Sequence, residues 1–222
     1  MLKLYDYFRS GAAYRTRIAL NLKGLEYEQS SIHLTRDGGE QFSEDYAALN
    51  PQKLVPTLID GETTLIQSMA IMEYLEDAYP EPSLLPAGAG PRARARGLAN
   101  IVACDIHPVN NLRVRLYLAG EMGVSKDGQK QWIENWIHLG FEAYEALLAD
   151  GATGRFSHGD MPSMADACLI PQIANARLNK VDIDRFPRIL EIDAFRTRSG
   201  NHKHFDNFAI HVIFVLFSQL FR

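Results

Sequence analysis

The chain has 222 residues, of which 46% are hydrophobic and 23% charged, and its formal net charge is −4 at pH 7. This mild acidity argues against nucleic acid as the main partner, because proteins that bind phosphate backbones usually carry a basic surface. The two cysteines, Cys104 and Cys168, stand alone, so the sequence has neither a Cys-x-x-Cys motif nor the spacing of a metal site. We therefore expect no metal centre and a reduced, cytoplasmic setting.

The N-terminal segment has the pattern of a strand, a helix and a second strand. Alternating residues over 2–7 predict the first strand, and apolar side chains recur every four residues over 13–23, a helical stripe that ends at Gly24. Residues 26–34 predict the second strand. Such a β-α-β unit favours parallel neighbouring strands joined by a right-handed crossover.

A polar segment follows, and then the pattern of a hairpin and a helix. Asp60-Gly61 lies between two apolar runs, which is the strongest short-range signal for a tight turn between strands. Ser68 stands where an N-cap is expected for a helix over 69–80. Residues 1–81 therefore predict a β-α-β-α-β-β-α domain.

Residues 82–90 are rich in Pro and Gly and predict a linker. No strand pattern occurs beyond them, so we expect an all-helical domain over 91–197, with its main helices within 92–123, 128–150 and 163–179. The basic stretch 91–97 is interpreted as an exposed helix start rather than a nucleic-acid patch. Ser163 and Asp166 have the spacing of a capping box, which we assign to stability.

The last segment, residues 198–222, is unusually rich in aromatic and aliphatic side chains between Phe208 and Phe221. This apolar tract is shorter than the roughly 20 residues that a membrane-spanning helix needs. We expect a buried or edge segment here and no contact with a membrane; the alternative is a poorly ordered or association-prone chain end.

Five stretches together resemble the soluble glutathione transferases, and in particular the zeta class, which contains the maleylacetoacetate and maleylpyruvate isomerases. They are "YFRSGAAYRTRIALNLKG", "ALNPQKLVPTLIDG", "LIQSMAIMEYLE", "CDIHPVNNLR" and "SMADACLIPQIANA". The resemblance covers nearly all of residues 1–196. It implies a thioredoxin-like α/β N-terminal domain followed by an all-α C-terminal domain, glutathione as the cofactor, and a homodimer.

This chain departs from the family pattern at two places. Zeta enzymes often carry Ser-Ser-Cys where this sequence has Ser10-Gly11-Ala12, so the cysteine is absent. After Phe195 the usual ending gives way to the aromatic tail.

Ser10 stands between a predicted strand and a helix N-terminus, where unpaired N–H groups and the helix dipole favour negative charge. Spacing alone is typical of a simple N-cap serine. The resemblance implies instead that the Ser10 hydroxyl donates a hydrogen bond to the glutathione thiolate and so lowers the pKa of the thiol. Gly11 and Ala12 are small enough to let the sulfur approach the backbone.

The other glutathione contacts are implied by the resemblance. Val55 precedes Pro56, a bond expected to be cis, and its backbone would pair with glutathione as an added strand. Ser68, at a helix start, would hold the γ-glutamyl carboxylate. The complete set of expected contacts is Ser10, Gly11, Ala12, Gln41, Val55, Gln67, Ser68, His107 and Asn111.

The second substrate of the similar enzymes is a maleyl keto acid with two carboxylates, so cations are expected beside the sulfur. The sequence offers Arg9, Arg113 and Arg177. Family members often place an arginine where this chain has Leu178, so Arg177 is the candidate least certain to face the site.

The leading hypothesis is therefore glutathione-dependent cis–trans isomerisation of maleylacetoacetate or maleylpyruvate to the fumaryl form, in aromatic catabolism. Two alternatives stay open at this point. One is a general glutathione transferase that conjugates or dehalogenates small electrophiles. The other is a binding module that keeps the fold without turnover.

Overall fold

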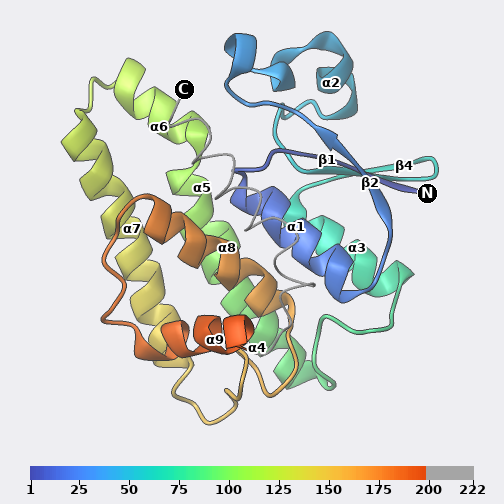
Figure 1. Ribbon diagram of the computed structural model, residues 1–222, viewed down its shortest axis with the longest axis vertical. Coiled ribbons are helices and arrows are strands. Elements are labelled where there is room, and N and C mark those ends of the chain that lie inside the picture. The colour runs from blue at the N-terminus through green and yellow to red at the C-terminus, as the bar shows by residue number, and fades with distance from the viewer. Residues whose placement is uncertain (199–222) are drawn as a thin grey trace. The chain divides into compact units, whose positions relative to one another are not determined.

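The computed structural model describes residues 1–198, with side chains to residue 195. It divides into two compact units, residues 1–84 and residues 85–195, shown in Figure 1. The division between Leu84 and Leu85 falls inside the predicted linker. The aromatic tract predicted between Phe208 and Phe221 lies outside the described residues.

The first unit is a mixed four-stranded sheet with helices, which confirms the predicted order of elements. The strands lie in the order β2-β1-β3-β4. In chain order the unit contains β1 (Leu2–Asp6), α1 (Gly11–Leu22), β2 (Tyr27–Ser31), 3-10 turns at Arg36–Gly38 and Glu40–Phe42, α2 (Glu44–Leu49), β3 (Thr57–Asp60), β4 (Thr63–Ile66) and α3 (Ser68–Ala78).

The parallel pairing of β1 with β2 and the hairpin of β3 with β4 are as predicted. β1 and β2 are parallel, and β3 is antiparallel to both β1 and β4. The hairpin between β3 and β4 is closed by Gly61 and Glu62, one residue later than predicted, because Asp60 pairs with Thr63. Gly61 has a φ of 58°, which glycine adopts at little cost. α1 and α3 pack against each other.

Two helix starts differ from the prediction. α1 begins at Gly11 rather than Ala13, because Ser10 caps the helix two residues earlier. α3 begins at Ser68, so the prediction that Ser68 is its N-cap is wrong. Gln67 is the N-cap, with a φ of 70°, and its carbonyl accepts the first helical hydrogen bond from the Ile71 N–H. The chain leaves β4 at Ile66 and must turn sharply, and the positive φ of Gln67 makes that turn.

A buried ion pair ties the end of the first unit to its helices. Lys23 Nζ lies 3.1 Å from Glu76 Oε2, and it also donates to the carbonyl oxygens of Tyr79 and Pro82. Glu76 in turn accepts a hydrogen bond from the Leu84 N–H at 2.8 Å. The start of the predicted linker is therefore fixed to the first unit.

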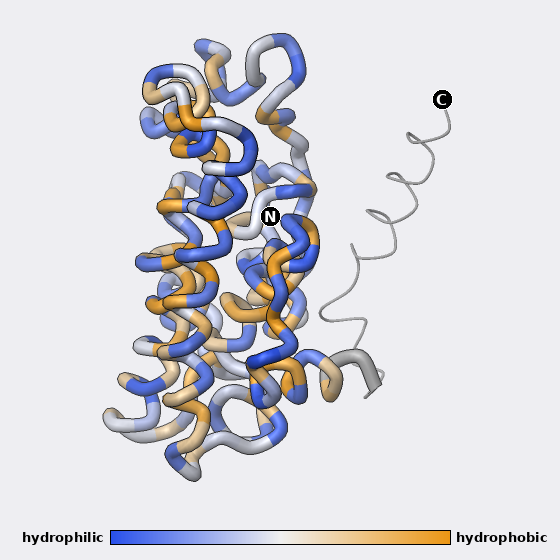
Figure 2. Tube along the Cα trace, turned by 90° about the vertical axis from the view of Figure 1, so that its left-hand side faces the viewer, coloured by the Kyte–Doolittle hydropathy of each residue, from blue (hydrophilic) through white to orange (hydrophobic). Residues whose placement is uncertain are grey.

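The second unit contains only helices among its regular elements in the described part of the chain, as predicted. They are α4 (Ala89–Asn100), a π-helical stretch (Ile101–Ile106), α5 (His107–Asn110), α6 (Leu112–Gly120), α7 (Lys126–Leu147), α8 (Met164–Leu178) and α9 (Pro187–Arg198). Hydrophobic and hydrophilic positions alternate along these helices (Figure 2). Their apolar faces form a core that includes Ile137, Phe141, Tyr144 and Leu169.

The helical prediction over 92–123 missed a break at Asn111. This residue is extended, with φ −71° and ψ 166°, and its Oδ1 accepts a hydrogen bond from the Val114 N–H at 3.2 Å. Asparagine is a favoured N-cap because its side chain satisfies an otherwise unpaired N–H of the first turn. Asn111 therefore begins a new helix, α6.

The predicted capping box at the start of α8 is confirmed. The buried Asp166 carboxylate accepts hydrogen bonds from the Ser163 N–H at 2.8 Å and the Ser163 hydroxyl at 2.9 Å. It also accepts one from the Ser157 N–H at 2.8 Å, so it joins the preceding loop to the helix. Burial raises the pKa of Asp166, although these hydrogen bonds oppose the rise.

In residues 1–198, each helix is either too short or too polar to cross a lipid bilayer.

We predict that Glu76→Gln destabilises the protein by about 3–5 kcal/mol, because the variant leaves the buried Lys23 without its counter-charge. Burial alone would raise the pKa of Glu76, but hydrogen bonds from Ser83, Leu84 and Lys23 outweigh it and lower that pKa. The Glu76 carboxylate therefore stabilises the fold at pH values above the ordinary carboxyl pKa. This stabilisation is lost as the pH falls through the lowered pKa of Glu76.

Urea denaturation at several pH values measures this effect, with Glu62→Gln, in the exposed hairpin turn, as the matched control. The difference in the free energy of unfolding between wild type and Glu76→Gln should decrease as the pH is lowered. Equal stability of the two glutamine variants at neutral pH would contradict the assignment.

Candidate functional site

The sheet register brings three predicted site segments to one end of the first unit. Tyr5 of β1 pairs with Thr57 of β3, and Thr57 pairs with Ile66 of β4. The residues just after β1, just before β3 and just after β4 therefore lie next to one another. These are the turn to Ser10, the Val55-Pro56 bond and the Gln67-Ser68 pair.

Ser10 forms the junction between β1 and α1. Its N–H donates to the Tyr7 carbonyl at 2.9 Å, its carbonyl accepts from the Tyr14 N–H at 2.9 Å, and its Oγ accepts from the Ala13 N–H at 3.2 Å. The cap uses the oxygen as an acceptor, so the hydroxyl proton can still be donated to another group. The N-cap role and the predicted donor role of Ser10 are therefore compatible.

The Val55–Pro56 peptide bond is cis, as predicted. Val55 is buried in a cluster with Tyr7 and Tyr46. Among the described residues, no hydrogen bond uses the backbone N–H or C=O of Val55. Because buried backbone groups are nearly always paired, this peptide unit is suited to pairing with the main chain of a peptide ligand.

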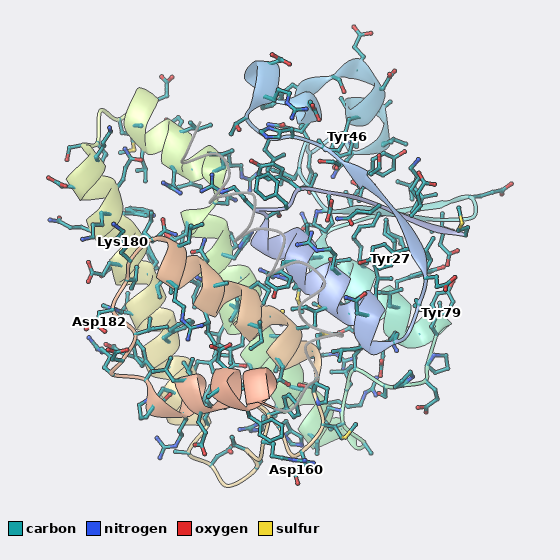
Figure 3. All side chains as sticks on the ribbon, viewed as in Figure 1. Tyr27, Tyr46, Tyr79, Asp160, Lys180 and Asp182 are labelled. Atoms are coloured by element: carbon teal, nitrogen blue, oxygen red, sulfur yellow. The ribbon has the colours of Figure 1, made fainter. Side chains whose placement is uncertain are left out.

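Two side chains that the sequence analysis did not single out hold this loop in place. Tyr46, on α2 (Figure 3), donates its hydroxyl to the Leu54 carbonyl at 2.6 Å. Asn50 Nδ2 donates to the same carbonyl at 2.8 Å. Burial raises the pKa of Tyr46, so its hydroxyl stays protonated and remains a donor. The quoted stretch "ALNPQKLVPTLIDG" contains Asn50, but nothing in its pattern assigns the residue to this carbonyl.

Ser68 is the first residue of α3 and is buried, with 7% of its surface exposed. Within the described chain, its hydroxyl takes part in no hydrogen bond. Gln67 is exposed and donates through Nε2 to Gln52 Oε1 at 2.6 Å. Ser68 thus combines an uncommitted hydroxyl with the N-terminus of an 11-residue helix.

Gln41 lies in the 3-10 turn before α2 and is almost fully buried. Its Nε2 donates to the Leu34 carbonyl at 3.3 Å, and its Oε1 is buried without a hydrogen-bond partner. Leu34 packs against the cluster that contains Tyr7 and Val55. One end of the Gln41 amide is therefore structural, and the other has no hydrogen-bond partner in the part of the chain that the structure describes.

The second unit carries the remaining predicted residues. His107 begins α5, Asn111 caps α6, and Arg113 lies exposed in the first turn of α6. Neither Arg113 nor Arg9, which is exposed beside Ser10, forms an ion pair or hydrogen bond within the described residues. Both guanidinium groups are thus available to an anion.

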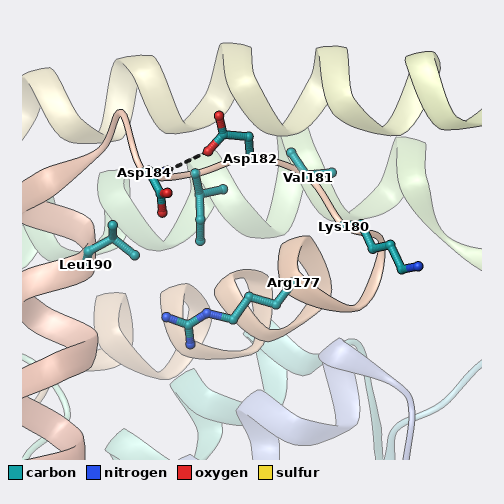
Figure 4. A pocket seen from close by; sticks show the side chains of 7 residues that line it. Arg177, Lys180, Val181, Asp182, Asp184 and Leu190 are labelled. Atoms are coloured by element: carbon teal, nitrogen blue, oxygen red, sulfur yellow. Dashed lines mark hydrogen bonds between the residues drawn. The ribbon is translucent and has the colours of Figure 1, made fainter.

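Arg177 has a different environment. Its Nη1 lies 2.7 Å from Oδ2 of Asp193, a carboxylate on α9 that is almost fully buried. It also borders an open hollow of about 370 Å³ between α8 and α9, and Figure 4 shows its side chain and that of Lys180 extending in opposite directions. Asp182 and Asp184 line the same hollow, so it is poorly suited to a dicarboxylate. Leu178 is exposed.

Residues 1–198 contain no group of three or more His, Cys, Asp or Glu side chains that could hold a metal ion.

Comparison with known proteins identifies the family. Residues 1–77 match the glutathione S-transferase N-terminal domain, and residues 130–192 match the corresponding C-terminal domain. The maleylpyruvate isomerase of a Ralstonia species is 50% identical over 194 residues, which are 87% of this chain and 91% of that protein. The chain belongs to the glutathione S-transferase family.

Solved structures of glutathione S-transferases agree with this. A zeta-class maleylpyruvate isomerase in its holo form has a TM-score of 0.84 and 50% identity, covering 86% of this chain and 90% of that one. The maleylacetoacetate isomerase of Methylobacterium extorquens, solved with malonate and glutathione, has a TM-score of 0.85 and 39% identity, covering 91% and 95%. The predicted two-part fold, thioredoxin-like and then helical, is confirmed.

Proposed function

We propose that this glutathione transferase is a glutathione-dependent cis–trans isomerase of a maleyl keto acid, maleylacetoacetate or maleylpyruvate. The names of its relatives support this activity. The observation that carries the chemistry is the Ser10 hydroxyl, which caps α1 as an acceptor and retains a proton to donate. A thiol held there is stabilised as the thiolate by this hydrogen bond and by the helix N-terminus.

The residues at the sheet end fit glutathione. The backbone of Val55 has the unpaired N–H and C=O that an extended peptide needs, and Ser68 at the start of α3 suits the γ-glutamyl carboxylate. Gly11 and Ala12 add no bulk beside Ser10. We assign glutathione to these residues together with the other predicted contacts: Gln41, Gln67, His107 and Asn111.

Glutathione, when bound, supplies a thiolate that adds to the cis double bond, allows rotation about the resulting single bond, and leaves again unconsumed. Ser10 keeps the sulfur ionised before and after each cycle. Arg9 and Arg113 neutralise the carboxylates of the keto acid, and cationic groups also stabilise the negative charge that develops on the conjugated carbonyl. Because Asp193 already occupies Arg177, we assign the substrate carboxylates to the other two arginines.

Turnover of maleylacetoacetate and maleylpyruvate, measured side by side with and without glutathione, tests the proposal. We expect loss of the maleyl absorbance only when glutathione is present, with the fumaryl acid as product. Equal rates without glutathione would reject the scheme. A stable thioether product would indicate a conjugating transferase, and failure to bind glutathione in calorimetry would indicate a module without turnover.

We predict that Ser10→Ala folds normally but raises the pKa of the bound glutathione thiol. Loss of a hydrogen bond to a charged group, about 1.5–3 kcal/mol, corresponds to a rise of roughly 1–2 pKa units. Titration of the thiolate absorbance in the ultraviolet measures it. An unchanged titration curve in the variant would remove Ser10 from this role.

We also predict that Arg113→Met and Arg177→Met behave differently. Arg113→Met should raise KM for the maleyl acid by about 10-fold or more, since it removes an available charge-assisted contact. Arg177→Met should lower the melting temperature, through loss of the Asp193 pair, and change KM less than twofold. Steady-state kinetics and thermal melts separate the two, and the reverse pattern would contradict the assignment.

We further propose a homodimer in the cytoplasm, in line with the family resemblance and with a sequence that has only two cysteines and no Cys-x-x-Cys motif. Analytical ultracentrifugation tests the first part, and a single species at the monomer mass of 25.0 kDa would contradict it.

A further inference from the structure

Arg15, in the middle of α1, is a buried charge for which residues 1–198 provide no ion pair or hydrogen bond. Only 2% of its surface is exposed, and its Nε is buried without a hydrogen bond. Within the described residues, no carboxylate and no hydrogen-bond acceptor lies in bonding distance of its guanidinium. An arginine cannot escape this situation by losing its proton, because its pKa is too high.

Arg17, the next arginine on α1, is also buried but has a counter-charge. Arg17 is 4% exposed, and it forms a buried ion pair with Asp6, which Gln29 also contacts. Tyr14 lies 5.4 Å from its guanidinium, ring face toward the charge. Two residues along a helix correspond to a rotation of about 200°. Arg15 therefore lies on nearly the opposite face of α1, away from Asp6.

A buried charge without a counter-ion is strongly unfavourable for folding, and a bound anion would remove this penalty. Side chains in a helix generally lean toward its N-terminus, so we expect the Arg15 side chain to lie over the preceding turn, on the side of Gly11. Gly11 lies one turn, about 6 Å, before Arg15 and follows Ser10 directly. Arg15 thus lies about one helical turn from the end of α1 where we place the reactive sulfur.

We propose that Arg15 binds a carboxylate of the bound reactants, and that this carboxylate belongs to the maleyl keto acid. The inference rests on the proposed function, and it supplies the buried cation that Arg177 does not provide. Arg15 then neutralises the substrate on the Ser10 side of the alkene, while Arg9 and Arg113 act from exposed positions.

Three variants test this: Arg15→Met, Arg15→Lys, and Arg17→Met as the matched buried control. Each is measured for its melting temperature without ligand, for its affinity for glutathione, and for its affinity for malonate at saturating glutathione. Malonate is used because it is a dicarboxylate without a double bond for the thiol to attack.

Arg15→Met should melt at or above the wild-type temperature, because it removes an unpaired buried charge. It should bind malonate about 10- to 100-fold more weakly, as expected for loss of a charge-assisted hydrogen bond, and bind glutathione normally. Arg15→Lys should recover part of the malonate affinity, since it restores the charge without the planar fork. Arg17→Met should melt at a lower temperature and keep both affinities.

If Arg15→Met loses affinity for glutathione instead, the carboxylate belongs to glutathione, which overturns the assignment to the keto acid. If it melts as low as Arg17→Met and retains both affinities, Arg15 is structural and the proposal fails. Should Arg15→Met not fold, unchanged malonate affinity in Arg15→Lys overturns the proposal. These binding measurements need no turnover, so an absence of isomerase activity would reject the proposed function without deciding the role of Arg15.

Discussion

The hydrogen bonding of a single serine, Ser10, links the fold to the chemistry. Its oxygen accepts from the Ala13 N–H at the start of α1, and in the proposed function its proton is donated to the sulfur. A hydroxyl does both because it has lone pairs and a proton on one atom. A carboxylate would cap the helix as well but would repel a thiolate. In the function that we propose, Ser10 does this without the cysteine that this chain lacks.

The buried charged side chains of the first unit are of two kinds. Those that form an ion pair have a structural role, and we propose a functional role for the one that does not. Asp6 with Arg17, and Lys23 with Glu76, are paired inside the unit and hold its helices to its sheet and to the segment that follows α3. In the second unit the buried Asp193 is paired with Arg177, whose own side chain is largely exposed. Arg15 is buried as deeply as Arg17 and Lys23, but it has no counter-charge among the described residues, and this difference is the basis on which we propose that it binds a ligand.

Local patterns in the sequence predicted the features that depend on neighbouring residues. The β-α-β opening, the capping box at Ser163 and the cis bond before Pro56 were all found as expected, the last through family resemblance. The predictions were wrong where a sharp turn, or a contact between residues far apart in the sequence, determines the local structure. Gln67, with its positive φ, is the N-cap of α3 in place of Ser68. Arg177 forms an ion pair with Asp193, a residue of another helix. Burial of Arg15 depends on tertiary packing and has no sequence signal.

A crystal structure of the protein with bound glutathione tests the central claim most directly. The account predicts the sulfur within hydrogen-bonding distance of Ser10 Oγ, with the cysteinyl main chain of the tripeptide paired to Val55. A sulfur atom turned away from the start of α1, with Ser10 bonded only to its own helix, would contradict it.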